Sequence, residues 1–296
     1  MSIPSFANYT GCCAACHFVF SHRIKIYSGR SPYVTILGNM PEDYSTLDQP
    51  RVLSVIFYPR KNVSVPPPGS TDHFIPVDNN TSVACRLYTH DLKSASILCF
   101  HGNAEVISDY DYVAPLYNQL GINLFVAEYR GYGASQGEPG FSTMISDAAI
   151  LFESFIAILN QHHYSKRIFV MGRSLGSVSA LEIACSHQKQ IKGLIIESGF
   201  GSILKLLLHQ DFPIGYLNFK DTEFPNVTNI RSVTIPTLIL HGRADTLISS
   251  SEAQLLFDNA GSEDKRLVII PKANHNDIMQ VGLGRYLKAI RKFVYH

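Results

Sequence analysis

The sequence predicts an α/β fold: a doubly wound, mostly parallel β-sheet with antiparallel N-terminal strands and a short cap segment. From residue 96 onward, short and nearly continuous apolar runs recur, and helical patterns lie between them. Strands of a parallel sheet have such runs because helices cover both of their faces. A strand that alternates with a helix indicates crossover connections, which place successive strands parallel in one sheet.

The composition supports a large folded core. The chain has 296 residues, of which 46% are hydrophobic and 17% are charged, so it is too apolar for a disordered chain. Lys and Arg number 25 against 24 Asp and Glu, a net charge of +1. This balance argues against sequence-independent binding to nucleic acid, which needs a clear basic excess. No apolar run approaches the roughly 18 residues of a membrane span, so we expect no transmembrane segment.

Residues 1–47 are predicted to form an N-terminal extension, and residues 48–296 the α/β domain. The first twenty residues lack both the basic start and the long apolar stretch of a secretory signal, so we expect a cytoplasmic protein. Three cysteines crowd together there, Cys12, Cys13 and Cys16. Their acylation would give peripheral membrane association. The alternative is a terminal segment that covers an apolar patch of the domain.

Three β-rich segments precede the alternating part of the chain. Val52–Tyr58 is rich in β-branched and aromatic residues, and His73–Val77 and Val83–Tyr88 flank the turn residues Asp78–Asn80. The stiff turn Pro66–Gly69 separates the first segment from the other two. We expect all three segments to form the antiparallel start of the sheet.

The alternating part holds the predicted parallel strands and their helices. The strands are Ser96–Phe100, Asn123–Ala127, Ile168–Met171, Leu194–Ile196, Thr237–Leu240 and Leu267–Ile270. Helical patterns fall near residues 106–120, 141–159, 175–187, 250–260 and 283–294. The stretch between Ser198 and Pro236 is longer than an ordinary crossover loop. Its part 199–232 is predicted as a cap-like insertion, whose apolar side chains either line an acyl pocket or pack on the sheet as one amphipathic helix.

The strand at Ile168–Met171 runs into Gly172-Arg173-Ser174-Leu175-Gly176 and then into a helical pattern. This is the pattern G-x-S-x-G in the context strand–turn–helix. A serine on so tight a turn projects its hydroxyl from the sheet edge, and the two glycines let the strand and helix backbones approach closely. Ser174 would also lie at a helix N-terminus, which favours developing negative charge. We therefore expect Ser174 to be a nucleophile.

A serine hydroxyl needs a base and an orienting acid, which in this arrangement follow in the order serine, acid, histidine. Asp245 follows the strand Thr237–Leu240, and His275 follows the strand Leu267–Ile270, so both lie past carboxyl ends of strands. We predict that Ser174, Asp245 and His275 form a catalytic triad. An aspartate in such a loop can instead be a turn former or a helix cap. The rival acids are Glu197, Asp211 and Asp277.

The tetrahedral intermediate needs backbone N–H donors, which form an oxyanion hole. One candidate is the amide of Leu175, directly after the nucleophile. The other is the amide of Asn103, in the loop that follows the strand Ser96–Phe100, where Gly102 would let the backbone turn sharply. The alternative is that His101 and Gly102 form a structural turn only, and His101 itself is expected to pack and hydrogen-bond rather than act as a second base.

These motifs resemble those of the α/β-hydrolase superfamily, and most closely the branch of lipid-anchored protein depalmitoylases and their bacterial relatives. The matching blocks are His101–Ala104, Glu128–Ser135, Gly172–Gly176, His241–Asp245 and Asn274–Asp277. The resemblance covers about residues 70–295 and implies the α/β-hydrolase fold, with the triad at Ser174, Asp245 and His275. It also implies palmitoylation of the N-terminal cysteines, although residues 18–70 show no clear correspondence.

The sequence therefore predicts a serine hydrolase that cleaves carboxylic esters or thioesters through an acyl-enzyme intermediate. The substrate would be a small molecule or an acylated protein, and the chemistry requires no cofactor and no metal. Two alternatives remain open. One is a serine peptidase or amidase with the same triad, and the other is a non-catalytic binding protein on the same scaffold.

Overall fold

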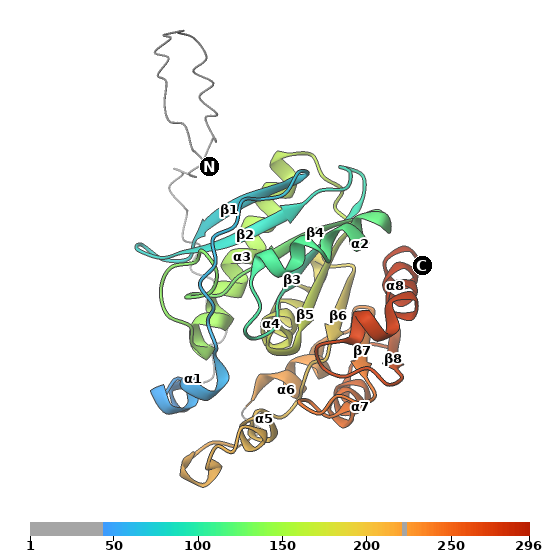
Figure 1. Cartoon of the computed structure of the whole chain (residues 1–296). Helices are drawn as coiled ribbons and strands as arrows, with labels where there is room; N and C mark the ends of the chain where they lie inside the picture. Colours follow the sequence, from blue (N-terminus) through green and yellow to red (C-terminus); the bar gives the residue numbers. More distant parts are fainter. Residues whose placement is uncertain (1–43, 221–223) are drawn as a thin grey trace, which may run out of the picture. The chain divides into compact units, whose positions relative to one another are not determined.

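The computed structural model describes residues 44–220 and 224–296, which are built around one eight-stranded sheet (Figure 1). The strand order is β1-β2-β4-β3-β5-β6-β7-β8. β1 (Ser70–Pro76) pairs antiparallel with β2 (Ser82–Tyr88), β2 pairs antiparallel with β4, and the other pairs are parallel. The remaining strands are β3 (Ala95–Phe100), β4 (Ile122–Ala127), β5 (Ile168–Arg173), β6 (Gly193–Glu197), β7 (Thr237–Gly242) and β8 (Lys265–Ile270). The predicted fold class is confirmed.

Helices cover both faces of this sheet (Figure 1). They are α1 (Pro50–Ile56), α2 (Ala114–Gln119), α3 (Phe141–Gln161), α4 (Ser177–Ser186), α5 (Ile203–His209), α6 (Pro225–Ser232), α7 (Ser250–Asn259) and α8 (Ile278–Tyr295). Side chains alternate across β5, so Val170 is buried in a hydrophobic cluster with residues of α3 and α4, and Met171 in a second cluster with residues of α2 and α8. The core therefore consists of two clusters separated by the sheet.

Within the described residues, α3 is the one helix long and apolar enough to cross a membrane, by length and composition only. One side of α3 packs into the core: Phe141, Phe152 and Phe155 are fully buried. A long apolar helix of this kind is also what the core of a globular α/β domain requires.

The segment Val52–Tyr58 forms helix α1 and an extended continuation, so its prediction as a strand is wrong. Pro50 occupies the first turn of the helix, where its fixed φ and missing N–H are tolerated. Val52 and Ile56, four residues apart, are both buried, so burial follows the helical period rather than the alternation of a strand. The β-branched composition of this segment alone did not distinguish a helix from a strand.

Two other segments differ from expectation in detail. The helix expected near 106–120 is a 3₁₀-helix, η2 (Ile107–Asp111), followed by the short α2. The insertion 199–232 contains α5, the 3₁₀-helix η5 (Ile214–Tyr216) and α6, so it is not one amphipathic helix. Ser202 begins α5 by accepting a hydrogen bond from the amide of Lys205, as an N-cap residue does.

The predicted N-terminal extension lies almost wholly outside the described residues. Cys12, Cys13 and Cys16 are among the residues not described, so their acylation stays a prediction. At the start of the described part, Tyr44 and Leu47 are buried in the core cluster with α3 and α4.

Candidate active site

β5 ends in a turn that holds Ser174 at the carboxyl edge of the sheet. Ser174 has a φ of +51°, in the left-handed region that costs an L-residue about 1–2 kcal/mol. A Cβ on Gly172 would lie 2.3 Å from the carbonyl oxygen of Gly176, and a Cβ on Gly176 would lie 2.1 Å from that of Phe100. Both glycines are therefore required, because the turn packs directly against its own strand and against the end of β3.

The structure brings the side chains of Ser174, His275 and Asp245 together. Nε2 of His275 lies 3.0 Å from Oγ of Ser174, and its Nδ1 lies 2.7 Å from Oδ2 of Asp245. A carboxylate can only accept a hydrogen bond, so Nδ1 carries the proton and Nε2 is free to accept the serine proton. All three residues are buried, although they come from loops after β5, β7 and β8.

Asp245 uses both of its oxygens. Oδ1 accepts the amides of Leu247 at 3.0 Å and Ile248 at 2.8 Å, while Oδ2 faces His275 and lies 3.2 Å from Nε2 of His241. Burial alone would raise the pKa of this carboxyl. The hydrogen bonds from His241, His275 and Ile248 outweigh burial and hold the pKa of Asp245 well below its usual range. Asp245 is thus both a turn former and the partner of His275.

Two of the three rival acids have other hydrogen-bond partners, and the third is exposed. Asp277, two residues after the histidine, accepts the amide of Asn274 at 2.6 Å and so shapes the loop itself. Glu197 accepts a hydrogen bond from Nε of Arg173 at 3.1 Å. Asp211 is exposed in the loop after α5.

The two candidate oxyanion donors lie on segments that touch. A Cβ on Gly176 would lie 2.8 Å from the carbonyl oxygen of His101, so the turn after β5 packs against the loop after β3. Leu175 is in that turn and is buried, and Asn103 is in that loop. The role of their amides as oxyanion donors stays a prediction.

The side chain of Asn103 holds its loop in place. Oδ1 accepts the hydroxyl of Tyr132 at 2.6 Å and the amide of Tyr58 at 2.9 Å, and Nδ2 donates to the carbonyl of Ile56. This side chain therefore ties the loop after β3 to the end of α1, to the segment that follows α1 and to the loop after β4.

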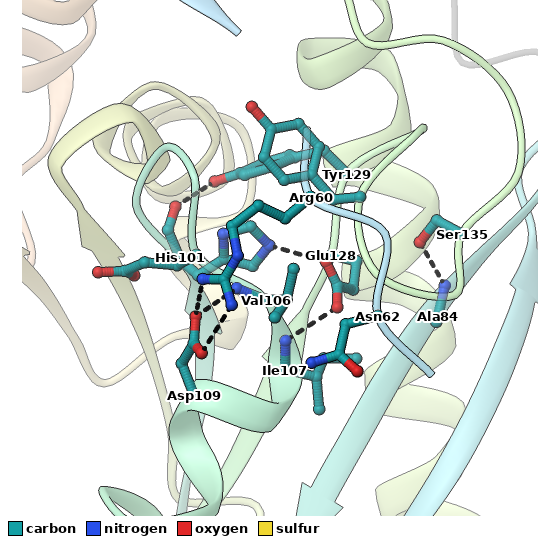
Figure 2. Close-up of polar contacts among 12 residues, drawn as sticks. Arg60, Asn62, Ala84, His101, Val106, Ile107, Asp109, Glu128, Tyr129 and Ser135 are labelled. Carbon is teal, nitrogen blue, oxygen red and sulfur yellow. Dashed lines mark hydrogen bonds and ion pairs between the residues drawn. The ribbon is translucent and has the colours of Figure 1, made fainter. Parts of the chain in front are cut away.

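His101 is a structural centre of the same loop (Figure 2). Its Nδ1 lies 2.7 Å from the carbonyl of Gly102, its Nε2 lies 3.2 Å from Oε2 of Glu128, and its carbonyl accepts the hydroxyl of Tyr129 at 2.7 Å. The other Glu128 oxygen accepts the amide of Ile107 at 2.9 Å. Burial would lower the pKa of His101, but the contact with Glu128 outweighs it and raises that pKa. These contacts fit the expected packing role of His101.

A surface ion pair between Arg60 and Asp109 contacts the loop after β3 (Figure 2). Nη1 of Arg60 donates to Oδ2 of Asp109 at 2.8 Å and to the carbonyl of Ala104 at 2.9 Å, and the same Asp109 oxygen accepts the amide of Val106 at 3.0 Å. Sequence reasoning missed these residues because an exposed charge pair separated by 49 positions leaves no local pattern.

The described cysteines Cys85, Cys99 and Cys185 are free, and burial raises the pKa of each thiol. Among residues 44–220 and 224–296, no group of three or more His, Cys, Asp or Glu side chains could hold a metal ion.

Comparisons with known proteins agree with this architecture. Residues 92–213 and 222–279 match the family described as serine aminopeptidase, S33. Protein bem46 of Schizosaccharomyces pombe is 32% identical over 208 residues, which cover 67% of each chain. The α/β hydrolase domain-containing protein 17B of Homo sapiens is 26% identical over 201 residues, which cover 67% of this chain and 66% of its own.

A solved structure gives the same fold. The esterase Pf2001 of Pyrococcus furiosus superposes with a TM-score of 0.65 at 18% identity, over 80% of this chain and 97% of its own. A likeness at that identity concerns the fold alone. The family and bem46, by contrast, match this chain in sequence. The resemblance expected from the motifs is therefore confirmed. The chain therefore belongs to the serine aminopeptidase S33 family of α/β-hydrolases.

Proposed function

We propose that the protein is a serine hydrolase that cleaves carboxylic esters or thioesters through Ser174, His275 and Asp245. The observation that carries the proposal is the continuous chain of two short contacts, 3.0 Å from Ser174 to His275 and 2.7 Å from His275 to Asp245. These are the distances that a general base needs to its nucleophile and to its orienting acid.

The proposed reaction has two halves. Oγ of Ser174 attacks the acyl carbon while Nε2 of His275 takes its proton, and the amides of Leu175 and Asn103 stabilise the oxyanion. The intermediate collapses to an acyl-enzyme as His275 returns the proton to the leaving alcohol or thiol. Water then attacks the acyl carbon of the acyl-enzyme while Nε2 of His275 takes its proton. His275 returns that proton to Oγ of Ser174 as the carboxylic acid is released. Asp245 holds the imidazole in the tautomer that the first step requires.

The insertion 199–232 supports an acyl substrate, either a small molecule or an acylated protein. Leu204, Leu206 and Phe212 are partly buried against the core, and Leu208 and Tyr216 are exposed at 52% and 84%. An insertion that carries apolar side chains on its surface is able to contact the hydrocarbon part of an acyl group.

The test combines a covalent probe with a substrate panel. A fluorophosphonate should label the wild type and not Ser174→Ala. The matched control is Ser177→Ala, which removes another buried serine three positions away and should label normally. The panel contains p-nitrophenyl esters, acyl thioesters and aminoacyl anilides. Turnover of esters or thioesters that is lost in Ser174→Ala supports the proposal.

Three other results would contradict the proposed function. If Ser174→Ala keeps the label or the turnover, Ser174 is not the nucleophile. If only the anilides are turned over, the protein is a peptidase or amidase. If the wild type neither labels nor turns over any class, the scaffold is a non-catalytic binding protein.

A further inference from the structure

Arg173 directly precedes the nucleophile and points its side chain toward the face of the sheet covered by α2 and α8. There it borders a pocket of about 340 Å³ whose walls include Leu116 of α2 and Leu283 of α8. The side chain itself is only 13% exposed. A charged group that is so little exposed is costly unless other groups pair with it, so its partners near Ser174 are informative.

The guanidinium of Arg173 contacts the end of β6 and the loops that follow β3 and β8. Nε donates to Oε1 of Glu197 at the end of β6, and Nη1 forms an ion pair with Glu105 in the loop after β3. Nη2 donates to the carbonyl of His275 at 3.0 Å and to Oδ1 of Asn276 at 3.2 Å in the loop after β8. One planar group thus contacts the backbone of the base, the end of the neighbouring strand β6, and the loop after β3, residues 101–106, which we call the oxyanion loop.

The contact with Glu105 continues into the oxyanion loop. Oε2 of Glu105 accepts the amide of Gly102 at 2.7 Å and the hydroxyl of Tyr110 at 2.9 Å. A Cβ on Gly102 would lie 2.5 Å from Nη1 of Arg173. Gly102 has no positive φ, so the sharp turn expected from the sequence does not require a glycine there, and the missing Cβ leaves room for the guanidinium in this position.

The charges around Arg173 keep it ionised. Burial would lower the pKa of Arg173, but the charges of Glu105 and Glu197 outweigh it and raise that pKa. Burial raises the pKa of Glu197, against the opposing charge of Arg173 and the hydroxyl of Tyr286. All three nitrogens of the Arg173 guanidinium contact acceptors, each in a different direction. A lysine ammonium at the end of a flexible chain does not reproduce this planar arrangement of donors.

We propose that Arg173 is a positioning residue that fixes the backbone of His275 and the oxyanion loop relative to Ser174. The inference rests on the proposed serine hydrolase function. Displacement of a reacting group by about 1 Å costs roughly 10²-fold in rate. Loss of Arg173 should therefore lower kcat, while KM, which depends on substrate contacts elsewhere, should change little.

The first measurement compares kcat and KM for the wild type, Arg173→Ala and Arg173→Lys on a p-nitrophenyl ester. We expect kcat to fall roughly 10²-fold in Arg173→Ala and to remain well below the wild type in Arg173→Lys, with KM within about twofold in both. Arg173→Lys keeps a positive charge between the two carboxylates, so it provides a folded variant if Arg173→Ala is unstable.

The second measurement uses chemical rescue. Because Arg173 borders the 340 Å³ pocket, guanidinium or methylguanidinium at millimolar concentration has access to the space that Arg173→Ala vacates. We expect kcat of Arg173→Ala to rise several-fold with either cation and not with ammonium. A residue that only stabilises the fold would not respond in this way.

The matched control is Arg86→Ala. Arg86 is also buried, with its side chain 3% exposed against 13% for Arg173, and it also pairs with two carboxylates, Asp72 and Asp111, but it lies on β2. Its loss should lower the melting temperature and leave kcat near the wild-type value without any rescue.

Three outcomes would overturn the role of Arg173: an unchanged kcat in Arg173→Ala, a wild-type kcat in Arg173→Lys, or rescue by ammonium as strong as by guanidinium. Each is measured on turnover that Ser174→Ala abolishes. Failure of the proposed function would instead appear as turnover that survives Ser174→Ala.

Discussion

The carboxylate of Asp245 binds His275 with one oxygen and its own loop with the other. Oδ2 lies 2.7 Å from Nδ1 of His275, and Oδ1 accepts the amides of Leu247 and Ile248. The acid is therefore held rigidly by the backbone that follows it. Because its position does not depend on the histidine, the Asp245 carboxylate can fix the imidazole rather than follow it.

Asp245→Asn should abolish most activity, and Asp277→Asn should not. An amide at position 245 no longer holds the proton on Nδ1 of His275, so kcat should fall by about 10³–10⁴-fold. Asp277 contacts the amide of Asn274 and shapes the loop only, so its loss should cost far less. Steady-state kinetics on a p-nitrophenyl ester compares the two, and reversed losses would make Asp277 the acid of the triad.

The stability that Asp245 contributes should disappear in acid. Its pKa in the folded state is lowered below the unfolded value of about 3.9, so the ionised form stabilises the fold above that pH. Below about pH 4 the unfolded chain takes up a proton first, and the contribution falls by up to about 1.4 kcal/mol per pH unit. Urea unfolding of the wild type and Asp245→Asn at pH 7 and pH 3 should show a smaller difference at pH 3. A difference that stays constant with pH would contradict the assignment.

Ser174→Gly should be more stable than Ser174→Ala although both are inactive. The φ of +51° at this position strains any side chain, whereas glycine adopts it freely. The relief of about 1–2 kcal/mol exceeds the entropic cost of glycine in the unfolded chain, so a net gain of about 0.5–1 kcal/mol is expected. Thermal unfolding of the two variants measures the difference, and a lower melting temperature for Ser174→Gly would show that the turn is not strained.

Gly176→Ala should destabilise the protein and impair catalysis together. The new Cβ would lie 2.1 Å from the carbonyl oxygen of Phe100, which is backbone and cannot move aside cheaply. We expect a loss of about 2–3 kcal/mol in the free energy of unfolding. The control is Gly284→Ala in α8, where nothing lies within 4 Å of the new Cβ. That change should stabilise the helix by about 0.5–1 kcal/mol and leave kcat unchanged. Equal effects of the two substitutions would refute the packing argument.

Local patterns in the sequence determined the fold class and the residues that meet at the candidate site. Apolar runs that alternate with helical periods are sufficient to predict a parallel sheet, and a G-x-S-x-G turn after a strand is contiguous in the chain. The order serine, acid, histidine after successive strands then places Ser174, Asp245 and His275 at one edge, because carboxyl ends of parallel strands meet there. The same patterns failed at Val52–Tyr58, where β-branched residues suit a strand and a packed helix alike.

Tertiary structure decided everything that depends on contacts between distant segments. Asp277 is two residues from His275 and Asp245 is thirty, yet the loop geometry directs only the carboxylate of Asp245 to Nδ1. Arg173 reaches the carbonyl of His275 across 102 positions, and no local period encodes such a contact. The physical reason is that a strand sets which side of the sheet a side chain faces, whereas the partner it meets depends on the register of neighbouring strands and on the loops that follow them.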